Sequence, residues 1–129
     1  MLTYQLRKNG HEVLSFVENN HGEGSGNFAE QKDGTPIPFE EWVWSDMGKQ
    51  SFDYDTKGAT ESDLVIYISP SGTDAWAEVG AAWASNVPIF GLHAKGEQSG
   101  LMRRMVRGWF DDWHDLLEHV EVMDKASKI

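Results

Sequence analysis

The sequence contains no cysteine, which excludes a disulfide framework and a thiolate metal site. Basic residues are also few: 11 Lys and Arg against 21 Asp and Glu give a formal net charge of −10. A nucleic-acid polymer is therefore not an expected partner, because binding its phosphates requires a basic face. The charge does not exclude a small anionic ligand that is held at one locally positive point.

Long apolar runs are missing as well. No stretch approaches the roughly 20 apolar residues of a membrane span, and the N-terminus lacks the charged-then-apolar pattern of a signal peptide. We therefore expect a cytoplasmic protein with no membrane partner. A chain of 129 residues is long enough for a single domain, 1–129, that buries its own core.

The hydrophobic pattern predicts alternating helices and strands. Helices are expected at 1–9, from 38 to about 60 with Gly48 as a candidate break, and at 73–85, 99–107 and 112–118; strands are expected at 11–17, 64–68, 87–92 and 119–123. The glycine-rich stretch 18–36 has no periodicity and is typical of a loop that is either functional or disordered. Short apolar strands separated by helices predict an α/β fold with a parallel sheet covered on both faces.

One strand is missing from this pattern. A doubly wound sheet normally begins with a strand before its first helix, but this chain starts inside that helix. In the strand order 2-1-3-4-5 the missing strand would lie centrally, between 11–17 and 64–68. Either the chain is truncated or mis-started, or another segment or subunit fills the position. Backbone groups that need partners beside such a gap favour a homodimer or a higher homo-oligomer.

The most informative segment follows the predicted strand 64–68, where Ser69-Pro70-Ser71-Gly72 opens a small-residue helix that carries Glu78. A loop at the carboxyl end of a buried strand turns backbone N–H groups toward a ligand, and the helix dipole favours an anion there. Glu78 lies about one and a half turns into the helix, too deep to complement the dipole. Such a carboxylate is either a structural group paired with an Arg or a hydroxyl, or a functional one.

Two linked motifs surround that strand. The first runs from Asp55 to Val65, with Asp55 eight residues before Asp63; the second runs from Gly72-Thr73 through Glu78-Val79-Gly80 to Val87-Pro88-Ile89. Together they resemble the nucleoside 2-deoxyribosyltransferase-like superfamily, which includes the 2′-deoxynucleoside 5′-phosphate N-hydrolases, over residues 10–92. The resemblance implies a flavodoxin-like or Rossmann-like three-layer sandwich whose first strand is missing from this chain. It also implies that the protein uses no cofactor and that its sites are built at the contacts between subunits.

The same resemblance implies cleavage or transfer at the N-glycosidic bond of a (2′-deoxy)nucleoside or its 5′-monophosphate. Glu78 matches the family's nucleophile, and Asp55 matches the aspartate that positions or protonates the departing base. Ser71-Gly72-Thr73 matches the loop that contacts the sugar and, in the hydrolases, the 5′-phosphate. The residue types suit this chemistry, because one carboxylate stabilises an oxocarbenium-like state while a second, protonated carboxyl donates to the leaving group. The two groups need environments that separate their pKa values.

The chain also departs from the family pattern. Gly72 stands where the transferases carry another aspartate, and Asp74 is shifted from that place by two positions. The tail that ends at Ile129 lacks the aromatic residues that transferases lend to a neighbouring chain. The segment resembles a less characterised branch of the superfamily more closely. A non-catalytic nucleotide or small-ligand binding domain on the same scaffold is therefore the alternative function.

Several candidate residues have a structural interpretation as well. Ser71 and Thr73 could simply cap the helix, and Asp55 could stabilise a turn or pair with Lys57. His93 ends a predicted strand at the carboxyl edge, where ligands bind in such sheets; it could assist a base or a phosphate, or be incidental.

The remaining charged groups give weaker signals. Arg103, Arg104 and Arg107 fall on overlapping faces of one predicted helical turn and could hold a phosphate. The adjacent Asp111 and Asp112 favour a surface ion-pair network instead. No metal is expected, because the spacing of the other four histidines is not that of metal ligands. These are His11, His21, His114 and His119.

Overall fold

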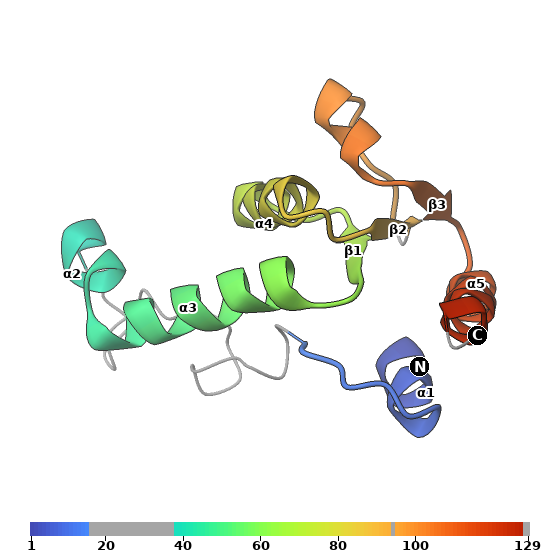
Figure 1. Cartoon of the computed structure of the whole chain (residues 1–129). Helices are drawn as coiled ribbons and strands as arrows, with labels where there is room; N and C mark the ends of the chain where they lie inside the picture. Colours follow the sequence, from blue (N-terminus) through green and yellow to red (C-terminus); the bar gives the residue numbers. More distant parts are fainter. Residues whose placement is uncertain (16–37, 94, 128–129) are drawn as a thin grey trace. The chain divides into compact units, whose positions relative to one another are not determined.

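The computed structural model describes residues 1–15, 38–93 and 95–127. The chain divides into two compact units: a sheet unit, Met1–Val13 with Ala59–Ile129, and a second unit, Leu14–Gly58. The helices are α1 (Leu2–Lys8), α2 (Phe39–Val43), α3 (Asp46–Glu61), α4 (Thr73–Ala84), the 3₁₀ helix η1 (Leu101–Met105) and α5 (Trp113–Ser127) (Figure 1). The strands are β1 (Val65–Ser69), β2 (Ile89–His93) and β3 (Gly108–Phe110). None of the helices in the described ranges is long and apolar enough to cross a membrane.

A three-stranded parallel sheet forms the centre of the sheet unit, in the order β1-β2-β3. The register runs from Val65↔Ile89 to Ser69↔His93 between β1 and β2, and from Phe90↔Gly108 to Leu92↔Phe110 between β2 and β3. The first four residues of β2 are all buried. A continuous buried run is expected for the central strand of a parallel sheet, because both of its faces are covered.

Helices cover both faces of this sheet. Ile89 and Tyr67 belong to the core on the α4 face, whereas Phe90 and Leu116 belong to the core on the face of α1 and α5. Successive residues of a strand point to opposite faces, so neighbouring residues of β2 supply the two cores in turn. The predicted α/β fold with a parallel sheet is therefore confirmed.

The outer edge of β1 has no partner strand among the described residues. The N–H of Val65 donates to the carbonyl of Pro88 at 2.9 Å, so alternate residues of β1 turn their backbone groups toward β2. Ile66 and Ile68 turn theirs outward, and the side chain of Ile68 is 50% exposed. No described residue fills the place beside 64–68 where the sequence pattern predicts a missing strand.

The predicted strand 11–17 is wrong for its described part, since residues 11–15 form no strand. Helix α1 ends in a left-handed turn at Gly10 (φ 97°), where the N–H groups of Gly10 and His11 donate to the carbonyls of Arg7 and Leu6. This Schellman arrangement satisfies the last carbonyls of the helix and redirects the chain. Residues 16–17 and the predicted loop 18–36 lie outside the described residues.

Gly48 does not break the helix predicted from residue 38. The break between α2 and α3 lies at Trp44 and Ser45, and the Ser45 Oγ accepts a hydrogen bond from the Gly48 N–H at 3.0 Å. Ser45 is thus the N-cap of α3 and Gly48 is the third residue of that helix. The capping signal of serine outweighs the helix-breaking tendency of glycine here.

The C-terminal region also differs from the predicted elements. The expected helix 99–107 is the short η1 followed by β3, a strand that the sequence pattern did not indicate. The expected strand 119–123 is wrong, because the segment continues α5. Leu116 and Val120 are buried four residues apart on the face that meets the sheet, and this helical spacing outweighs the strand preference of the valines.

Candidate functional site

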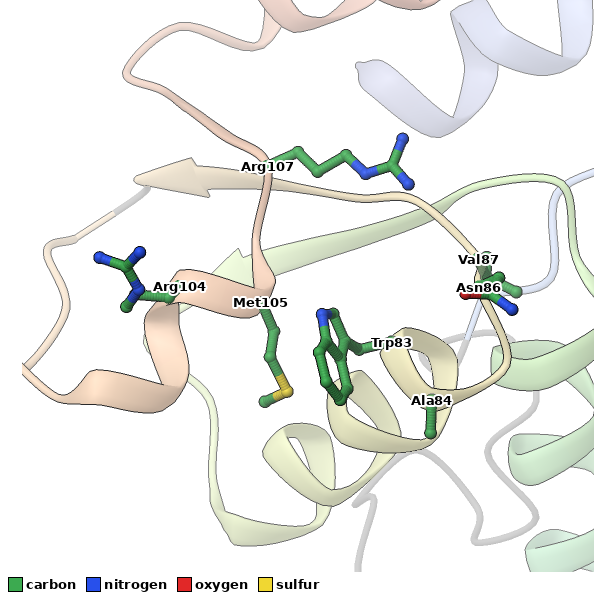
Figure 2. Close-up of a pocket in the computed structure, with 7 residues that line it drawn as sticks. All are labelled: Trp83, Ala84, Asn86, Val87, Arg104, Met105 and Arg107. Carbon is green, nitrogen blue, oxygen red and sulfur yellow. The ribbon is translucent and has the colours of Figure 1, made fainter.

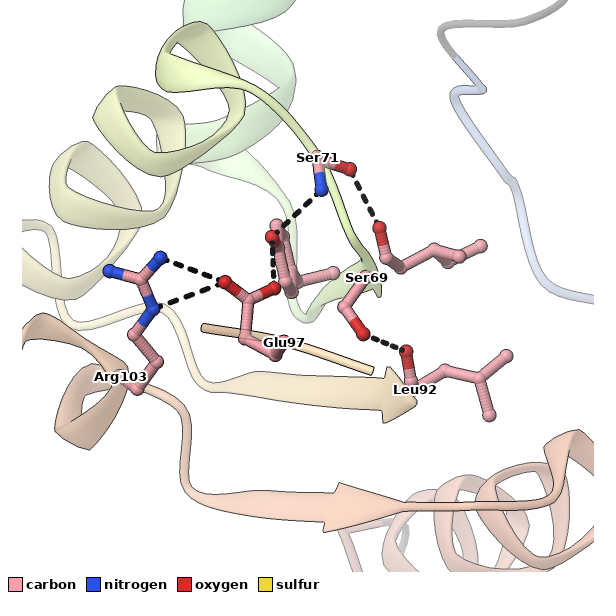
Figure 3. A network of polar contacts seen from close by, with 7 residues as sticks. Ser69, Ser71, Leu92, Glu97 and Arg103 are labelled. Carbon is pink, nitrogen blue, oxygen red and sulfur yellow. Dashed lines mark hydrogen bonds and ion pairs between the residues drawn. The ribbon is translucent and has the colours of Figure 1, made fainter. Parts of the chain in front are cut away.

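The loop between β1 and α4 is fixed by three hydrogen bonds from its serines (Figure 3). Ser69 is only 1% exposed, and its Oγ donates to the Leu92 carbonyl at 3.2 Å, which ties the end of β1 to β2. The Ser71 Oγ donates to the Ile68 carbonyl at 2.6 Å, and the Ser71 N–H donates to the Tyr67 hydroxyl at 3.1 Å. The loop is therefore held from both the strand and the core below it.

Helix α4 begins without a side-chain cap. Its N-cap is Gly72, and no side chain in the described part of the chain makes a capping hydrogen bond to it. The helix's own first backbone bond runs from the Trp76 N–H to the Gly72 carbonyl at 3.4 Å. Within the described ranges the N–H groups of the preceding turn, at residues 73–75, have no acceptor. The alternative in which Ser71 or Thr73 caps the helix is therefore wrong, and the turn retains free donors and the positive end of the helix dipole.

The charge at this turn is not uniformly favourable to anions. Asp74 lies exposed in the first turn of α4, where the helix dipole stabilises a carboxylate. A phosphate that approached the N–H groups of residues 73–75 from the side of Asp74 would meet its negative charge. Any anion at this helix terminus must therefore approach from another direction or displace the Asp74 side chain.

A polar network lies next to the loop, on the α4 face of the sheet (Figure 3). The Tyr67 hydroxyl donates to the Glu97 Oε2 at 2.7 Å, and the Arg103 Nη2 and Nε donate to the Glu97 Oε1 at 2.8 and 3.2 Å. The guanidinium also lies over the ring of Trp76, 4.3 Å from its centroid. Because Tyr67 also accepts the Ser71 N–H, the network joins the segments after β1 and β2 with η1.

The pKa values in this network reflect its geometry. Burial is the main cause that raises the pKa of Tyr67, and the hydrogen bond to Glu97 raises it further. The phenol is therefore a donor at neutral pH. Burial by itself would raise the pKa of Glu97, but the hydrogen bonds from Tyr67 and Arg103 outweigh it and hold the pKa below its ordinary value. Glu97 is therefore an ionised anchor, although its side chain is only 7% exposed.

The sequence pattern did not identify Tyr67 and Glu97 as members of this polar network. The apolar run around Tyr67 indicates a core residue of a strand, and Glu97 lies in a polar segment with no periodicity. The sequence left Arg103 either as a phosphate ligand or, in the favoured interpretation, as part of an ion-pair network with Asp111 and Asp112. Its partner in the structure is Glu97, six residues earlier. Only the fold brings the Glu97 carboxylate and the Tyr67 hydroxyl together, 30 positions apart.

Aromatic rings complete the surroundings of the network. Trp76 lies 4.6 Å from Tyr67 between ring centroids, and Trp109 stacks at a tilt on His93 at 4.4 Å. The Trp76 indole N–H is buried and makes no hydrogen bond to the described residues. His93 is half-buried at the carboxyl end of β2, the position that the sequence predicted. Its imidazole packs against an indole ring.

Glu78 is half-buried on α4 and takes part in an interaction within the structure. At about 100° per residue, Trp76 and Glu78 fall on opposite flanks of the apolar stripe formed by Ala75, Val79 and Ala82. The Trp76 flank meets η1, which follows β2. The Glu78 flank is therefore the one turned toward the open edge of β1.

The candidate site residues fall in both units. Ser71, Gly72, Thr73, Asp74, Glu78 and His93 belong to the sheet unit, near the carboxyl ends of β1 and β2 or on the helix that starts there. Asp55 belongs to the second unit, where it is half-buried inside α3. The interpretation of Asp55 as a turn residue is therefore wrong, because it lies in the middle of a helix and makes an interaction there.

A pocket of about 300 Å³ lies at the other end of α4 (Figure 2). Its lining comprises Trp83, Ala84, Asn86, Val87, Arg104, Met105 and Arg107. Because α4 has 12 residues and is about 18 Å long, this pocket is remote from the loop at its N-terminus. It splits the expected arginine cluster, since Arg104 and Arg107 line the pocket while Arg103 binds Glu97.

A group of potential metal ligands lies away from the carboxyl ends of β1 and β2. Among the described residues, His11, Glu121 and Asp124 have donor atoms within 4.8 Å of one another, where the end of α1 meets α5.

Comparison of the chain with models of protein families, with curated proteins and with solved structures finds no match.

Proposed function

We propose that the protein binds a nucleoside or its 5′-monophosphate at the carboxyl ends of β1 and β2 and cleaves or transfers at its N-glycosidic bond. The observation that carries the proposal is the β1–α4 connection. A loop fixed by Ser69 and Ser71 leads into an uncapped helix terminus, and Glu78 follows in the second turn of that helix. Ligands of parallel α/β sheets bind outside the carboxyl ends of the strands, where such a helix terminus lies.

Each residue has a defined role in this proposal. The first-turn N–H groups of α4, next to Ser71, would bind the 5′-phosphate or a sugar hydroxyl. The Glu78 carboxylate would attack the anomeric carbon as the base departs, forming a glycosyl ester that water or a second base then resolves. Asp55 would position or protonate the departing base.

The fold proposal has its own support. Helices α1 and α5 cover one face of the sheet, α4 covers the other, and the outer edge of β1 has no partner strand among the described residues. We propose that this is the flavodoxin-like or Rossmann-like arrangement in which a further strand lies beside β1. Glu78 would then stand on the flank of α4 above that strand. Supply of the strand by a second copy of the chain would account for the expected homo-oligomer.

The alternative is a nucleotide or small-ligand binding domain without turnover. It is favoured by one observation: the donors at the start of α4 are set by backbone and loop contacts that do not involve Glu78. Such a terminus can hold a phosphate whether or not a nucleophile is present. Binding and turnover must therefore be measured separately.

The decisive experiment follows free-base release by liquid chromatography from a panel of deoxynucleosides and their 5′-monophosphates. Each substrate is incubated with and without a second base, using wild-type protein, Glu78→Gln and Glu118→Gln. Glu118 is exposed on α5 and provides a matched loss of one carboxylate away from the site. We expect Glu78→Gln to lower the rate at least a hundredfold and Glu118→Gln to leave it unchanged.

Each possible outcome has a clear meaning. Product that depends on a second base identifies a transferase, and free base formed with water alone identifies a hydrolase. Equal turnover by wild type and Glu78→Gln would refute the assigned nucleophile. Nucleotide binding detected by a thermal shift, with the nucleotide recovered intact after long incubation, would replace the enzyme with the binding domain.

A further inference from the structure

His11, Glu121 and Asp124 form a three-ligand cluster outside the proposed nucleoside site. The His11 Nε2 and the Glu121 Oε1 are 2.8 Å apart, and donor atoms of all three residues lie within 4.8 Å of one another. The side chains of His11 and Glu121 are 24% and 26% exposed. The cluster is therefore partly shielded but still reachable from solvent.

The backbone holds His11 in place independently of this cluster. The Schellman turn at the end of α1 fixes the His11 N–H on the Leu6 carbonyl at 3.0 Å, and Leu6 is itself buried in the core on the α1–α5 face. A Schellman turn of this kind is rigid, because two backbone bonds and a left-handed glycine determine it. The main chain at His11 is therefore fixed without an ion, and the contact with Glu121 holds the imidazole beside α5.

The two carboxylates are preset by α5. Glu121 and Asp124 are three residues apart, so they lie on one face of the helix as neighbours. The helix is anchored to the sheet through Leu116 and Val120. Three oxygen and nitrogen donors therefore converge from two elements that are each fixed by their own packing.

We propose that this cluster binds a divalent transition-metal ion, with Zn²⁺ the best match. Zinc takes histidine nitrogen at about 2.0–2.1 Å and carboxylate oxygen at about 2.0–2.2 Å, so bound donors lie roughly 3 to 3.5 Å apart in a tetrahedron. Small rotations of the side chains bring donors within 4.8 Å to that spacing. One imidazole with two carboxylates suits zinc better than Mg²⁺ or Ca²⁺, which prefer oxygen ligands alone.

Zinc binding also determines where His11 carries its proton. Binding requires the Nε2 of His11 to carry no proton, with the remaining ring proton on Nδ1, because Nε2 must offer its lone pair to the ion in place of its contact with Glu121. Three protein ligands leave at least one coordination position for water.

A second histidine provides a matched comparison. The Nδ1 of His114 is also 2.8 Å from a carboxylate oxygen, that of Asp112, but the structure gathers no third ligand there among its described residues. A simple His–carboxylate pair therefore exists elsewhere on the same chain. What distinguishes His11 is the third donor from Asp124.

The bound ion would clamp the end of α1 to α5 across 110 positions of sequence. Binding to the folded state alone would then raise the melting temperature by mass action. At a Zn²⁺ concentration a hundredfold above Kd, we expect a rise of roughly 8 to 13 °C. The effect is independent of any nucleoside chemistry, so its failure would leave the proposed function untouched.

The test uses tag-free full-length protein, with Zn²⁺ or Mg²⁺ added after chelator treatment, followed by titration calorimetry and thermal unfolding. The variants are Asp124→Asn, which preserves size, and Asp112→Asn as the matched control. We expect one Zn²⁺ per chain for wild type and Asp112→Asn, at least tenfold weaker binding for Asp124→Asn, and no Mg²⁺ response. Co²⁺ in place of Zn²⁺ should give the visible absorption of a low-coordinate nitrogen–oxygen site in wild type, and this absorption should weaken in Asp124→Asn.

Two results would overturn the proposal. Absence of stoichiometric Zn²⁺ binding by wild type would show that the cluster is only an ion pair with a neighbouring carboxylate. Equal affinity of wild type and Asp124→Asn would show that any bound zinc lies elsewhere. Circular dichroism of each variant before the titration checks that the fold is retained, so weaker binding reports the lost ligand.

Discussion

Replacement of Tyr67 by phenylalanine tests whether the polar network beside the β1–α4 loop stabilises the fold. The substitution removes one oxygen atom and keeps the buried ring in contact with Trp76. It deletes the bond to Glu97 at 2.7 Å and the acceptor for the Ser71 N–H at 3.1 Å. Glu97 remains nearly buried, with Arg103 as its remaining partner.

The expected magnitude follows from these two bonds. A hydrogen bond to a charged group contributes about 1.5 to 3 kcal/mol. The exposed Ser71 can recover solvent for its N–H, so the second bond adds about 0.5 kcal/mol at most. Removal of a buried hydroxyl offsets part of the loss. We therefore expect the free energy of unfolding to fall by about 2 kcal/mol, which for this chain length lowers the melting temperature by roughly 6 to 10 °C.

Urea unfolding followed by tryptophan fluorescence and by circular dichroism measures this change. Tyr4→Phe is the matched control, because Tyr4 is 59% exposed and should change the free energy of unfolding by less than about 0.5 kcal/mol. A double-mutant cycle with Glu97→Gln should give a coupling energy of about 1 kcal/mol or more. A Tyr67→Phe protein as stable as the Tyr4→Phe protein, or a coupling energy near zero, would refute the network as a source of stability.

Two further predictions concern acid stability and the central strand. The pKa of Glu97 in the folded protein is below its ordinary value of 4.5, so the stability that ionised Glu97 contributes is present above pH 4.5 and is lost as the pH falls through the lower folded pKa. Wild type should therefore lose more stability than Glu97→Gln on acidification below pH 4.5. Urea midpoints that fall in parallel for both proteins would contradict this. A Cβ at Gly91 would overlap the ring of Trp109, so Gly91→Ala should lower the free energy of unfolding by about 1 to 3 kcal/mol. Gly80→Ala, in open space on α4, should instead raise it by about 0.5 to 1 kcal/mol, and calorimetric melting curves in the reverse order would contradict the packing assignment.

Local patterns in the sequence predicted the elements with strong local signals. The apolar run at 64–68 gave β1 within one residue at each end, and the Lys8-Asn9-Gly10 ending gave the end of α1. The position of His93 at the carboxyl end of a strand also followed from its place after an apolar run. These features depend on residues that are adjacent in the chain, so no knowledge of the tertiary fold was needed.

Elements with ambiguous signals were predicted less well. β3 has only three residues, too few to show a period, and the valines of α5 favour a strand in isolation. Packing of Leu116 and Val120 against the sheet decides for the helix. The described residues 11–15 have an apolar pattern that is compatible with a strand, but no neighbouring strand pairs with them.

The sequence by itself determined the α/β class, the parallel sheet, and the loop and helix that carry Ser71, Thr73 and Glu78. These follow from hydrophobic periodicity and from turn residues, which act over a few positions. Only the tertiary structure decided which distant groups meet: Glu97 with Tyr67, and His11 with Glu121 and Asp124. Contacts across 30 or 110 positions leave no period or spacing in the sequence, because they are set by how helices pack on the sheet.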